Sequence, residues 1–346
     1  MSLFSNHLID NTFGLTCRAK TLLRPTNAEL IPESLKSARD TSLPTVIVGA
    51  GSNLLLLDEQ LDACVIAPAI TGISIEQVDD DHARIVAGAG ENWHPFVMRC
   101  LNAGWQGLEN LALIPGNVGA APTQNIGAYG VEVADRIAHV DAYEMTSGQL
   151  HRFQPEQLQF GYRDSFFKRE GKSRFLISSV AFRLVRNAPL NTGYEALKQA
   201  LAATPDDLIT AKRVAEAVIA VRQSKLPDPA KLGNAGSFFK NPVVDADLFE
   251  SLQSRYATVP HYPQTDGRIK LAAGWLIERA GLKGMRRGDA GVHELQALVI
   301  VNHGNASGQQ LFDVAREVRD TVWQQFAIEL EPEVRILNRR AEDVVL

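Results

Sequence analysis

Short apolar runs interrupted by glycine predict buried strands along the first half of the chain. They lie at residues 44–57, 83–90, 136–146, 149–153 and 175–185. The first run, PTVIVGAGSNLLLL, contains two apolar stretches separated by a glycine turn, and the second, ARIVAGAG, repeats the strand-then-glycine pattern. The third and fourth are joined by a Ser-Gly pair and together predict a hairpin.

Three other stretches have the apolar spacing and the end signals of helices. NWHPFVMRCLNAG (92–104) closes on a glycine. A second helix is predicted to begin at Thr204, which is followed by a proline and two acidic residues, and to continue as far as Pro227. In the third, Ser307 and Gln310 form a capping-box pattern ahead of an apolar stripe.

The stretches between these elements are also informative. Residues 105–130 follow neither a helical nor a strand period, and a loop of that length inside a compact domain is more often functional than not. Residues 225–236 are the best candidate linker. EPEVRIL, near the C-terminus, predicts a short strand with Glu333 and Arg335 on one face. Mixed strands and helices with long loops indicate the α+β fold class.

Composition and charge narrow the class of protein. The chain has 346 residues, 45% of them hydrophobic and 22% charged, which is an ordinary globular composition and enough for about two domains. A formal net charge of −5 is opposite in sign to that of a non-specific nucleic-acid binder, so we expect no nucleic-acid partner. MSLFSNHLID has no signal-peptide pattern, and no stretch approaches the roughly 18 to 20 apolar residues of a membrane helix. We therefore expect a soluble cytoplasmic protein with no membrane partner.

Common cofactor and catalytic motifs are absent. Cys17, Cys64 and Cys100 are far apart and have no CxxC or Cys/His cluster, so neither disulfides nor a metal site is expected. The sequence has no P-loop, no GxSxG and no HExxH. GAGSNL (49–54) and GAGENW (88–93) begin like dinucleotide fingerprints, but a leucine and a tryptophan replace the third glycine, which argues against a Rossmann site.

Two glycine-rich segments are the candidate ligand sites. Glycine allows backbone N–H groups to approach a ligand closely and to form an anion-binding concavity. GAGSN adds the Ser52 hydroxyl and the Asn53 amide, which are suitable donors to diphosphate oxygens. IPGNVGAAPTQNIGAYG (114–130) adds the amides of Gln124 and Asn125 and an aromatic side chain without a net charge. The longer segment is the stronger candidate.

That segment closely resembles the signature loop of the UDP-N-acetylenolpyruvoylglucosamine reductases, flavoenzymes of bacterial cell-wall precursor synthesis. Eight further motifs occur in the family's order: NTFGL, VGAGSNLLL, FGYRDSFFK, RQSKLPDP, GNAGSFFKNP, YPQTDGRIKLAAGWLIE, HELQALVIVN and LEPEVRI. The resemblance spans nearly the entire chain. The Tyr194 segment and the intact KLAAGWLIE stretch are similar to the family's longer, first type.

The resemblance implies a vanillyl-alcohol-oxidase-type FAD-binding fold of two subdomains and a C-terminal α+β substrate-binding domain. The implied boundaries are 1–70 with the C-terminal strand 329–346, then 71–226, then 227–328. The implied reaction reduces the enolpyruvyl ether of UDP-N-acetylglucosamine enolpyruvate to the lactyl ether of UDP-N-acetylmuramate. NADPH would supply a hydride through FAD. We expect these small molecules to be the partners and the protein to be a monomer.

The matched motifs also imply catalytic and binding residues. Hydride addition creates an enolate-like carboxylate, which calls for a cation, a second charge-stabilising group and a proton donor. The resemblance assigns these roles to Arg163, Glu333 and Ser237 respectively, with Glu333 protonated. The cofactor positions implied are Gly49, Gly51, Ser52, Asn53, Leu54, Ile114, Pro115, Gly116, Gly119, Thr123, Gln124, Asn125, Gly127, Ala128, Arg222 and Arg335. The substrate positions implied are Tyr129, Tyr162, Tyr194, Lys225, Asn241, Tyr262, Lys270 and Gln296.

Some positions depart from the family's pattern. Asn117 and Thr123 replace the usual Ser or Thr and the usual Ile, and Asn338 stands where a glycine commonly follows the last strand. These departures concern flavin contacts and the C-terminal tail. No Cys or His occurs between Gln106 and Glu132, so we expect non-covalently bound FAD.

Two other functions remain open at this point. One is a flavin oxidase in the same fold that acts on a sugar alcohol or lactone and passes electrons to oxygen. The combination of Arg163, Glu333 and Ser237 argues against it, because alcohol oxidation needs a base and no enolate-binding group. The other is a non-catalytic nucleotide-sugar binding protein that has lost its flavin.

Overall fold

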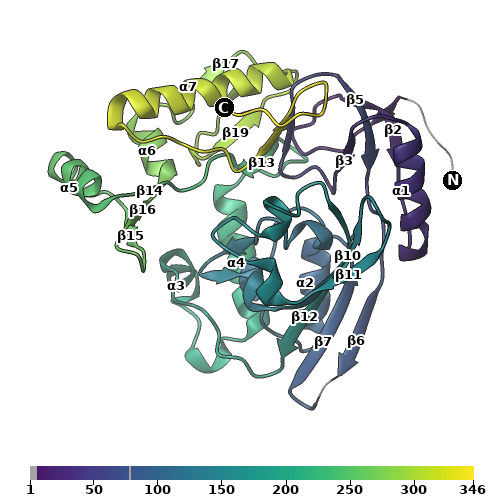
Figure 1. Cartoon of the computed structure of the whole chain (residues 1–346). Coiled ribbons are helices and arrows are strands. Elements are labelled where there is room, and N and C mark those ends of the chain that lie inside the picture. The colour runs from purple at the N-terminus through teal and green to yellow at the C-terminus, as the bar shows by residue number, and fades with distance from the viewer. Residues whose placement is uncertain (1–5, 78) are drawn as a thin grey trace. The chain divides into compact units, whose positions relative to one another are not determined.

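The computed structural model describes residues 6–77 and 79–346. Residues 1–5, part of the segment from which the absence of a signal peptide is expected, lie outside the described residues. The chain forms two compact units, whose elements are labelled in Figure 1. Unit 1 contains residues 19–50 and 62–224 with the described residues up to His7, and unit 2 contains residues 8–18, 51–61 and 225–346.

A five-stranded antiparallel sheet forms the centre of unit 1, in the order β11-β10-β12-β7-β6. β10 and β11 pair from Val140 opposite Phe153 to Tyr143 opposite Leu150, which confirms the predicted hairpin. β12 spans the run that predicts it. The strands are β6 (Ile73–Gln77), β7 (His82–Gly88), β10 (Ile137–Glu144), β11 (Leu150–Phe153) and β12 (Phe175–Val185).

Two helices bury their apolar faces in the same core as this sheet. They are α2 (Trp93–Asn102) and α4 (Ala211–Lys225). The ring of Phe182, on β12, lies 5.9 Å from that of Trp93 and 5.1 Å from that of Phe96 between centroids. Buried aromatic side chains supply much of the apolar area in a core. This packing fixes the first turn of α2, which adjoins the glycine-rich segment described below.

The rest of unit 1 contains a smaller sheet, a two-stranded sheet of β8 and β9, and the helices α1 and α3. The smaller sheet has the order β1-β2-β5-β3, with β3 and β5 parallel. Leu35 and Ala38 of α1 share a buried cluster with Leu23, Cys64 and Ile66. The elements are β1 (His7–Leu8), β2 (Arg18–Leu23), α1 (Ile31–Asp40), β3 (Thr45–Ile47), β5 (Gln60–Ile66), β8 (Gly127–Ala128), β9 (Val131–Glu132) and α3 (Glu195–Leu201).

Unit 2 has its own core beneath α7 (Gly308–Phe326), which packs on β18 and β19 (Figure 1). Ser307 accepts a hydrogen bond from the Gln310 N–H and Gln310 bonds back, confirming the predicted capping box. The four-stranded sheet has the order β13-β19-β18-β17, and the three-stranded sheet β14-β16-β15. The remaining bounds are β4 (Leu54–Leu56), β13 (Gly233–Ser237), β14 (Val243–Val244), α5 (Ala246–Arg255), β15 (His261–Pro263), β16 (Ile269–Leu271), α6 (Ala273–Arg279), β17 (Arg286–Arg287), β18 (Ala290–Val292), β19 (Val299–Asn302) and β20 (Arg335–Leu337).

The predicted start of the helix at Thr204 is wrong. Only a short 3₁₀ turn, Asp206–Leu208, follows Pro205, and the α-helix begins at Ala211. The hydroxyl oxygen of Thr210 accepts from the Arg213 N–H at 3.2 Å, so this second threonine caps the helix. Ile209, extended between the two turns, packs against the core of unit 1. Its burial breaks the helical path that the Thr-Pro-Asp-Asp signal predicts.

Glu333 and Arg335 do not share a strand face as predicted. β20 begins at Arg335 and pairs in parallel with β4, Arg335 opposite Leu54. Glu333 precedes the strand in a bend, where its N–H donates to the Phe238 carbonyl at 2.8 Å. Its own carbonyl accepts from the Asn53 side chain at 3.1 Å. Glu333 is therefore held outside the β4–β20 ladder, by Phe238, which follows Ser237, and by the side chain of Asn53.

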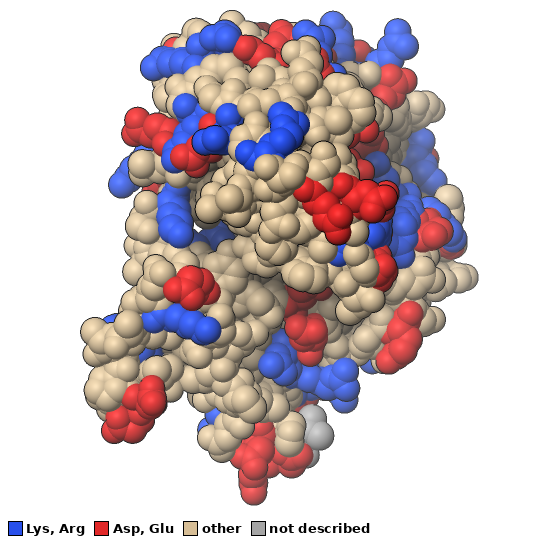
Figure 2. Space-filling model, turned by 90° about the vertical axis from the view of Figure 1, so that its left-hand side faces the viewer, with Lys and Arg blue, Asp and Glu red and all other residues tan. Residues whose placement is uncertain are grey.

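The surface carries both signs of charge. Figure 2 shows Lys and Arg interspersed with Asp and Glu over the visible face. Several ion pairs of the described residues are exposed, such as that of Arg287 with Glu317 at 2.6 Å. Among the described residues, no helix is long and apolar enough to cross a membrane.

Candidate active site

The glycine-rich segment of unit 1 is bound through its backbone to the residues around the start of α2. The Val118 and Gly119 N–H groups donate to the Glu91 and Ala89 carbonyls at 2.8 and 2.9 Å. The Trp93 N–H donates to the Gly116 carbonyl at 2.9 Å. A Cβ on Gly119 would lie 2.5 Å from that of Ala89, so only glycine permits this approach. The packing places the loop backbone against the core.

His94 also holds the start of the glycine-rich segment, although no motif in the sequence predicts this role. Its Nδ1 accepts from the Leu113 N–H at 3.1 Å, at the residue that precedes the segment. Leu113 has a left-handed backbone, φ 61°, which is uncommon for a residue with a side chain. Burial lowers the pKa of His94, and the nearby Arg222 charge lowers it further. His94 is therefore neutral at pH 7, with its proton on Nε2.

Asn125 anchors the segment to the loop that carries Arg163. Its side chain is fully buried and donates to Glu132 Oε2 at 2.6 Å and to the Gly161 carbonyl at 3.0 Å. Its Oδ1 accepts from the Ala134 N–H at 3.1 Å. These contacts occupy the amide that the sequence offers as a cofactor donor. Asn125 thus shapes the segment with its side chain.

Arg163 lies at the tip of a tight turn and reaches back to the same segment. Gly161 and Asp164 exchange backbone hydrogen bonds, and Arg163 between them has φ 54°. Such a strained conformation is often stored at functional sites. The guanidinium donates from Nη2 to the Gly127 carbonyl at 2.7 Å and lies 5.5 Å from the Tyr162 ring centroid. The turn is fixed by Ser165, whose hydroxyl donates to the Thr123 carbonyl at 2.7 Å.

Arg222 gives the clearest test of whether unit 1 fits an anionic cofactor. Its Nε is buried and has no hydrogen-bond partner among the described residues. Burial lowers the pKa of its guanidinium, as does the positive charge of Arg163, while Tyr129 acts in the opposite direction. A buried donor beside a second cation is costly unless an acceptor is present. The environment therefore fits a ligand with electron-rich oxygen or nitrogen atoms, such as the flavin pyrimidine ring.

Tyr129 lies near Arg222 and contacts a second tyrosine, Tyr194. The rings of Tyr129 and Tyr194 meet edge to face, with centroids 5.3 Å apart. Burial raises the pKa of Tyr129, partly offset by the Arg222 charge, so its phenol is protonated at neutral pH. Tyr129 has φ 49°, and Tyr194 is exposed immediately ahead of α3. Unit 1 thus brings together Tyr129, Tyr194, Arg163 and Arg222 from four distant stretches of sequence.

In unit 2 the segment Gly51–Leu54 is joined to the end of the chain. Gly51 has φ 65°, and a Cβ there would collide with the Asp10 carbonyl. The Arg335 N–H donates to the Asn53 carbonyl at 3.1 Å, and the Asn53 side chain donates to the Glu333 carbonyl. The guanidinium of Arg335 is paired with Asp343 at 2.7 Å. The backbone conformation requires glycine at position 51.

Ser237 and Glu333 lie within the same small network of unit 2. Ser237 is the last residue of β13 and follows Gly236, which has φ 72°. The next residue, Phe238, donates to the Leu298 carbonyl and accepts from the Glu333 N–H, both at 2.8 Å. Ser237 is half-buried. The structure thus connects two of the three predicted catalytic residues through one backbone hydrogen bond.

The predicted substrate residues of unit 2 surround the start of α6 and the three-stranded sheet. The Asn241 Oδ1 accepts from the Ala273 N–H at 3.0 Å, which caps α6. Lys270 and Tyr262 are opposite each other on β16 and β15, with the ammonium 5.9 Å from the ring centroid. Gln296 approaches α6, since a Cβ on Gly274 would lie 3.2 Å from its Oε1. Lys225 is exposed at the end of α4.

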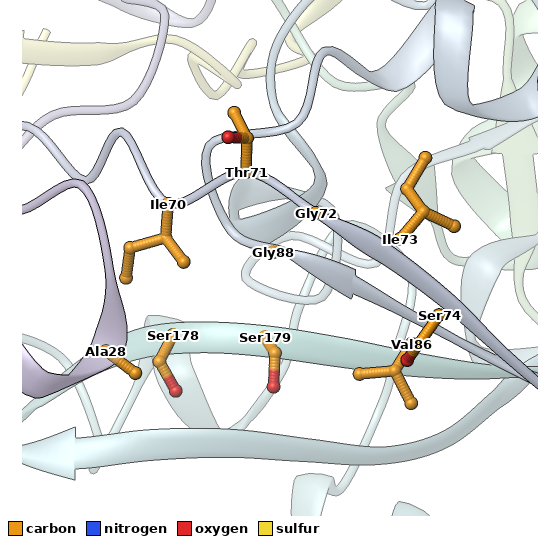
Figure 3. Close-up of a pocket in the computed structure, with 10 residues that line it drawn as sticks. All are labelled: Ala28, Ile70, Thr71, Gly72, Ile73, Ser74, Val86, Gly88, Ser178 and Ser179. Carbon is orange, nitrogen blue, oxygen red and sulfur yellow. The ribbon is translucent and has the colours of Figure 1, made fainter.

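Three other features of the described residues bear on alternative chemistry: the cysteines, possible metal-binding groups and a pocket. Burial raises the pKa of Cys17, Cys64 and Cys100 to about 12, 11 and 12, so these thiols are not nucleophiles at neutral pH. No group of three His, Cys, Asp or Glu side chains that could hold a metal ion occurs in residues 6–77 and 79–346. A pocket in unit 1, drawn in Figure 3, is lined by small, aliphatic and hydroxyl side chains, none of them a predicted site residue.

Comparison with known proteins identifies the family. Residues 228–337 match the UDP-N-acetylenolpyruvoylglucosamine reductase C-terminal domain, and residues 19–154 match an FAD binding domain. The reductase of Chromobacterium violaceum is 50% identical over 328 residues, covering 94% of this chain and 96% of its own. That of Pseudomonas syringae pv. tomato is 48% identical, covering 93% of this chain and 95% of its own. This chain belongs to the UDP-N-acetylenolpyruvoylglucosamine reductase family.

Solved structures agree with the family assignment. The reductase (MurB) of Thermus caldophilus has 26% identity and a TM-score of 0.67, covering 96% of this chain and 98% of its own. A solvent-stable cholesterol oxidase, 13% identical with a TM-score of 0.50, shares the fold alone, covering 95% of this chain and 86% of its own. The predicted α+β, vanillyl-alcohol-oxidase-type FAD-binding fold is confirmed. The chain is an FAD-dependent oxidoreductase, as the resemblance implies.

Proposed function

We propose that this enzyme reduces UDP-N-acetylglucosamine enolpyruvate to UDP-N-acetylmuramate with FAD and NADPH, a step in the synthesis of peptidoglycan precursors. Family membership across nearly the whole chain carries the reaction. The cluster of Tyr129, Tyr194, Arg163 and Arg222 in unit 1 supports the proposed site. Bound FAD would supply the redox chemistry, with NADPH as the source of the hydride that reduces the substrate's C=C bond.

The residues proposed to hold FAD fall into two groups. The first is backbone-rich and comprises Gly49, Gly51, Ser52, Asn53 and Leu54 with Ile114, Pro115, Gly116, Gly119, Thr123, Gln124, Asn125, Gly127 and Ala128. The second is cationic and comprises Arg222 and Arg335. A positive charge near the flavin pyrimidine ring stabilises its anionic reduced form. The orphaned Nε of Arg222 supports this role, whereas the ion pair with Asp343 lowers the net positive charge around Arg335.

Arg163 is proposed to bind the carboxylate of the enolpyruvyl group. Hydride addition moves negative charge onto that carboxylate, and a guanidinium held in advance stabilises it without reorganisation. The Gly127 carbonyl and the Tyr162 ring restrict the guanidinium in this structure. The negative charge of the substrate would also offset the electrostatic repulsion between the Arg163 and Arg222 guanidinium groups.

Ser237 and Glu333 are proposed to complete the chemistry. Ser237 would donate a proton to the α-carbon, which is a strong base once the enolate-like intermediate forms. Glu333, in its protonated form, would donate a hydrogen bond to the enol oxygen. Their connection through Phe238 supports a joint role, because a shift of one backbone would move the other.

The remaining assignments concern the substrate and the cellular setting. Tyr129, Tyr162, Tyr194, Lys225, Asn241, Tyr262, Lys270 and Gln296 are proposed to bind the UDP-sugar. A diphosphate favours cations and hydroxyl donors, which this set supplies. We further propose the division 1–70 with 329–346, 71–226 and 227–328, a monomer in the cytoplasm, and no nucleic-acid partner.

An absorbance trace with each substrate added in turn tests the function. The purified protein should be yellow, should lose its visible absorbance with NADPH, and should recover it on addition of the enolpyruvyl substrate. Denaturation should release intact FAD, since no covalent link is expected. NADPH consumption that proceeds with oxygen alone at the same steady rate would instead indicate an oxidase. Protein that stays colourless after FAD is added would indicate a binding protein.

A further inference from the structure

We infer that Asn110 is a positioning residue that fastens the Tyr194 segment to the Tyr129 loop and thereby sets the affinity for the UDP-sugar. The inference rests on the proposed role of these tyrosines in substrate binding. Asn110 itself is not proposed to touch substrate or cofactor. Its effect is transmitted through the backbone of two segments that lie far apart in the sequence.

The amide of Asn110 bridges the two tyrosine-bearing segments. Its Nδ2 donates to the Tyr129 carbonyl at 3.0 Å and to the Asn191 carbonyl at 2.8 Å. An amide NH₂ has two hydrogens, so these two bonds use its full donor capacity. Because both neighbours are carbonyl oxygens, the amide can face them only through its nitrogen. The bridge is specific to a side chain with two donors at one atom.

A second tie runs between the same segments. The Asn191 side chain donates to the Gly130 carbonyl at 3.0 Å, next to the Tyr129 carbonyl that Asn110 binds. Gly130 has φ 79°, and a Cβ there would lie 3.2 Å from the Asn191 amide nitrogen. The two asparagines therefore hold the segments together at adjacent peptide groups, three residues before Tyr194.

Asn110 lies in a buried turn that is held by hydrogen bonds on both sides. Asn110 is 1% exposed and sits in a short 3₁₀ turn, Glu109–Leu111. The Glu109 carboxylate accepts from the Gly107 N–H at 2.7 Å, and the Leu111 carbonyl accepts from the buried Trp93 indole at 2.8 Å. The same tryptophan fixes Gly116 of the glycine-rich segment. Asn110 thus connects the segments that carry Tyr129 and Tyr194 to the core of unit 1.

The cost of this arrangement points to a functional role. The Asn110 Oδ1 is buried and has no hydrogen-bond partner among the described residues. A buried polar atom without a partner destabilises the fold, and an apolar residue would avoid the penalty. The two hydrogen bonds that Asn110 donates offset part of this penalty. Their common effect is to set the spacing of Tyr129 and Tyr194, whose ring centroids are 5.3 Å apart.

The test compares two variants of the bridge with a matched control. Asn110→Asp keeps the size of the side chain but leaves at most one donor, the O–H of a protonated carboxyl group. Asn191→Ala removes the second tie at an exposed position where folding is not at risk. Asn187→Ala, also exposed in unit 1, is the control. We expect the KM for the UDP-sugar to rise at least tenfold in Asn110→Asp and at least threefold in Asn191→Ala. Asn187→Ala should leave it unchanged. FAD retention and the rate of flavin bleaching by NADPH should stay within about threefold of the wild type in all three.

A double-mutant cycle with Tyr194→Ala separates this inference from the proposed function. If Asn110 and Asn191 act through Tyr194, their substitutions should have little further effect on KM once Tyr194 is removed. Additive effects would overturn the inference, as would wild-type KM values in both asparagine variants or parallel loss of NADPH bleaching. An unchanged KM in Tyr194→Ala alone would overturn the proposed role of Tyr194. If Asn110→Asp does not fold, the double-mutant cycle of Asn191→Ala with Tyr194→Ala tests the inference on its own.

Discussion

The guanidinium of Arg163 donates a hydrogen bond of 2.7 Å to the carbonyl oxygen of Gly127. This contact joins a strained turn to the glycine-rich segment, and Asn125 secures the same junction through Gly161. The proposed carboxylate ligand is therefore oriented by the same loop that is proposed to contact FAD. Both assignments can be tested by measuring the two half-reactions separately, namely flavin reduction by NADPH and flavin reoxidation by the enolpyruvyl substrate.

Substitution of Arg163 by lysine should impair only the reaction with the enolpyruvyl substrate. Lysine keeps the charge but loses the planar fork that suits a carboxylate. We expect kcat/KM for the enolpyruvyl substrate to fall by about 10²-fold or more, which corresponds to about 2.7 kcal/mol of transition-state stabilisation. Stopped-flow bleaching by NADPH should stay near the wild-type rate. Equal loss in both half-reactions would show that the substitution disturbs the loop and not the carboxylate.

Ser237→Ala should distinguish the same two steps for a different reason. Reduction of FAD by NADPH forms no carbanion, so it needs no proton donor and should stay within about tenfold of the wild type. Reoxidation by the enolpyruvyl substrate should slow by more than about 10²-fold, since water would replace a positioned donor. Ser237→Cys should retain more activity than the alanine variant. Normal reoxidation in Ser237→Ala would exclude Ser237 as the donor.

Local signals in the sequence predict most of the elements. The Ser147-Gly148 turn predicts the hairpin of β10 and β11, and the Ser307 and Gln310 pair predicts the start of α7. Both depend on contacts within a few residues. The start of α4 does not, because Ile209, half-buried against the core of unit 1, is extended and the helix begins only at Ala211. Glu333 likewise leaves the predicted strand because Phe238 and Asn53 bind its backbone.

The candidate site is only partly visible in the sequence for the same reason. Motif resemblance identifies Arg163, Tyr129 and Arg222, but no local pattern predicts that one guanidinium lowers the pKa of the other. His94 and Asn110 lie in no recognised catalytic pattern, yet each binds backbone at an edge of the site. The absence of regular periodicity in residues 105–130 marks the stretch that contains Asn110, whereas His94 lies in the predicted helix 92–104 and has no such signal.

A matched pair of glycines in unit 2 should separate steric from conformational cost. Gly51 and Gly14 have nearly equal backbone angles, φ 65° and 70°, but only Gly51 is crowded, by the backbone of Asp10 and Asn11. Gly14→Ala should cost about 1–2 kcal/mol for the left-handed conformation alone. Gly51→Ala should cost more and should release FAD, because the backbone on both sides must move. Equal melting temperatures for the two variants would show that the crowding at position 51 is relieved without a cost in stability.

The neutral state of His94 should make stability fall on the acid side. Burial lowers its folded pKa below the ordinary value of 6.5, so the unfolded chain takes up the proton first as pH decreases. The stabilisation from His94 is therefore complete above about pH 6.5 and is lost as pH falls from there towards the folded pKa. Protonation would also remove the acceptor for the Leu113 N–H.

Two substitutions isolate this effect. His94→Asn places a carbonyl oxygen near the former Nδ1 and does not titrate, whereas His94→Leu leaves the Leu113 N–H without its acceptor. At pH 7.5 we expect His94→Leu to lose about 1–3 kcal/mol and to bind FAD more weakly, with His94→Asn close to the wild type. Between pH 7.5 and 5.5 the melting temperature of the wild type should fall further than that of His94→Asn. His139, His293 and His303 have pKa values lowered mainly by burial too, but they are present in both proteins and cancel in the difference. Identical acid profiles for the wild type and His94→Asn would show that His94 does not titrate with unfolding.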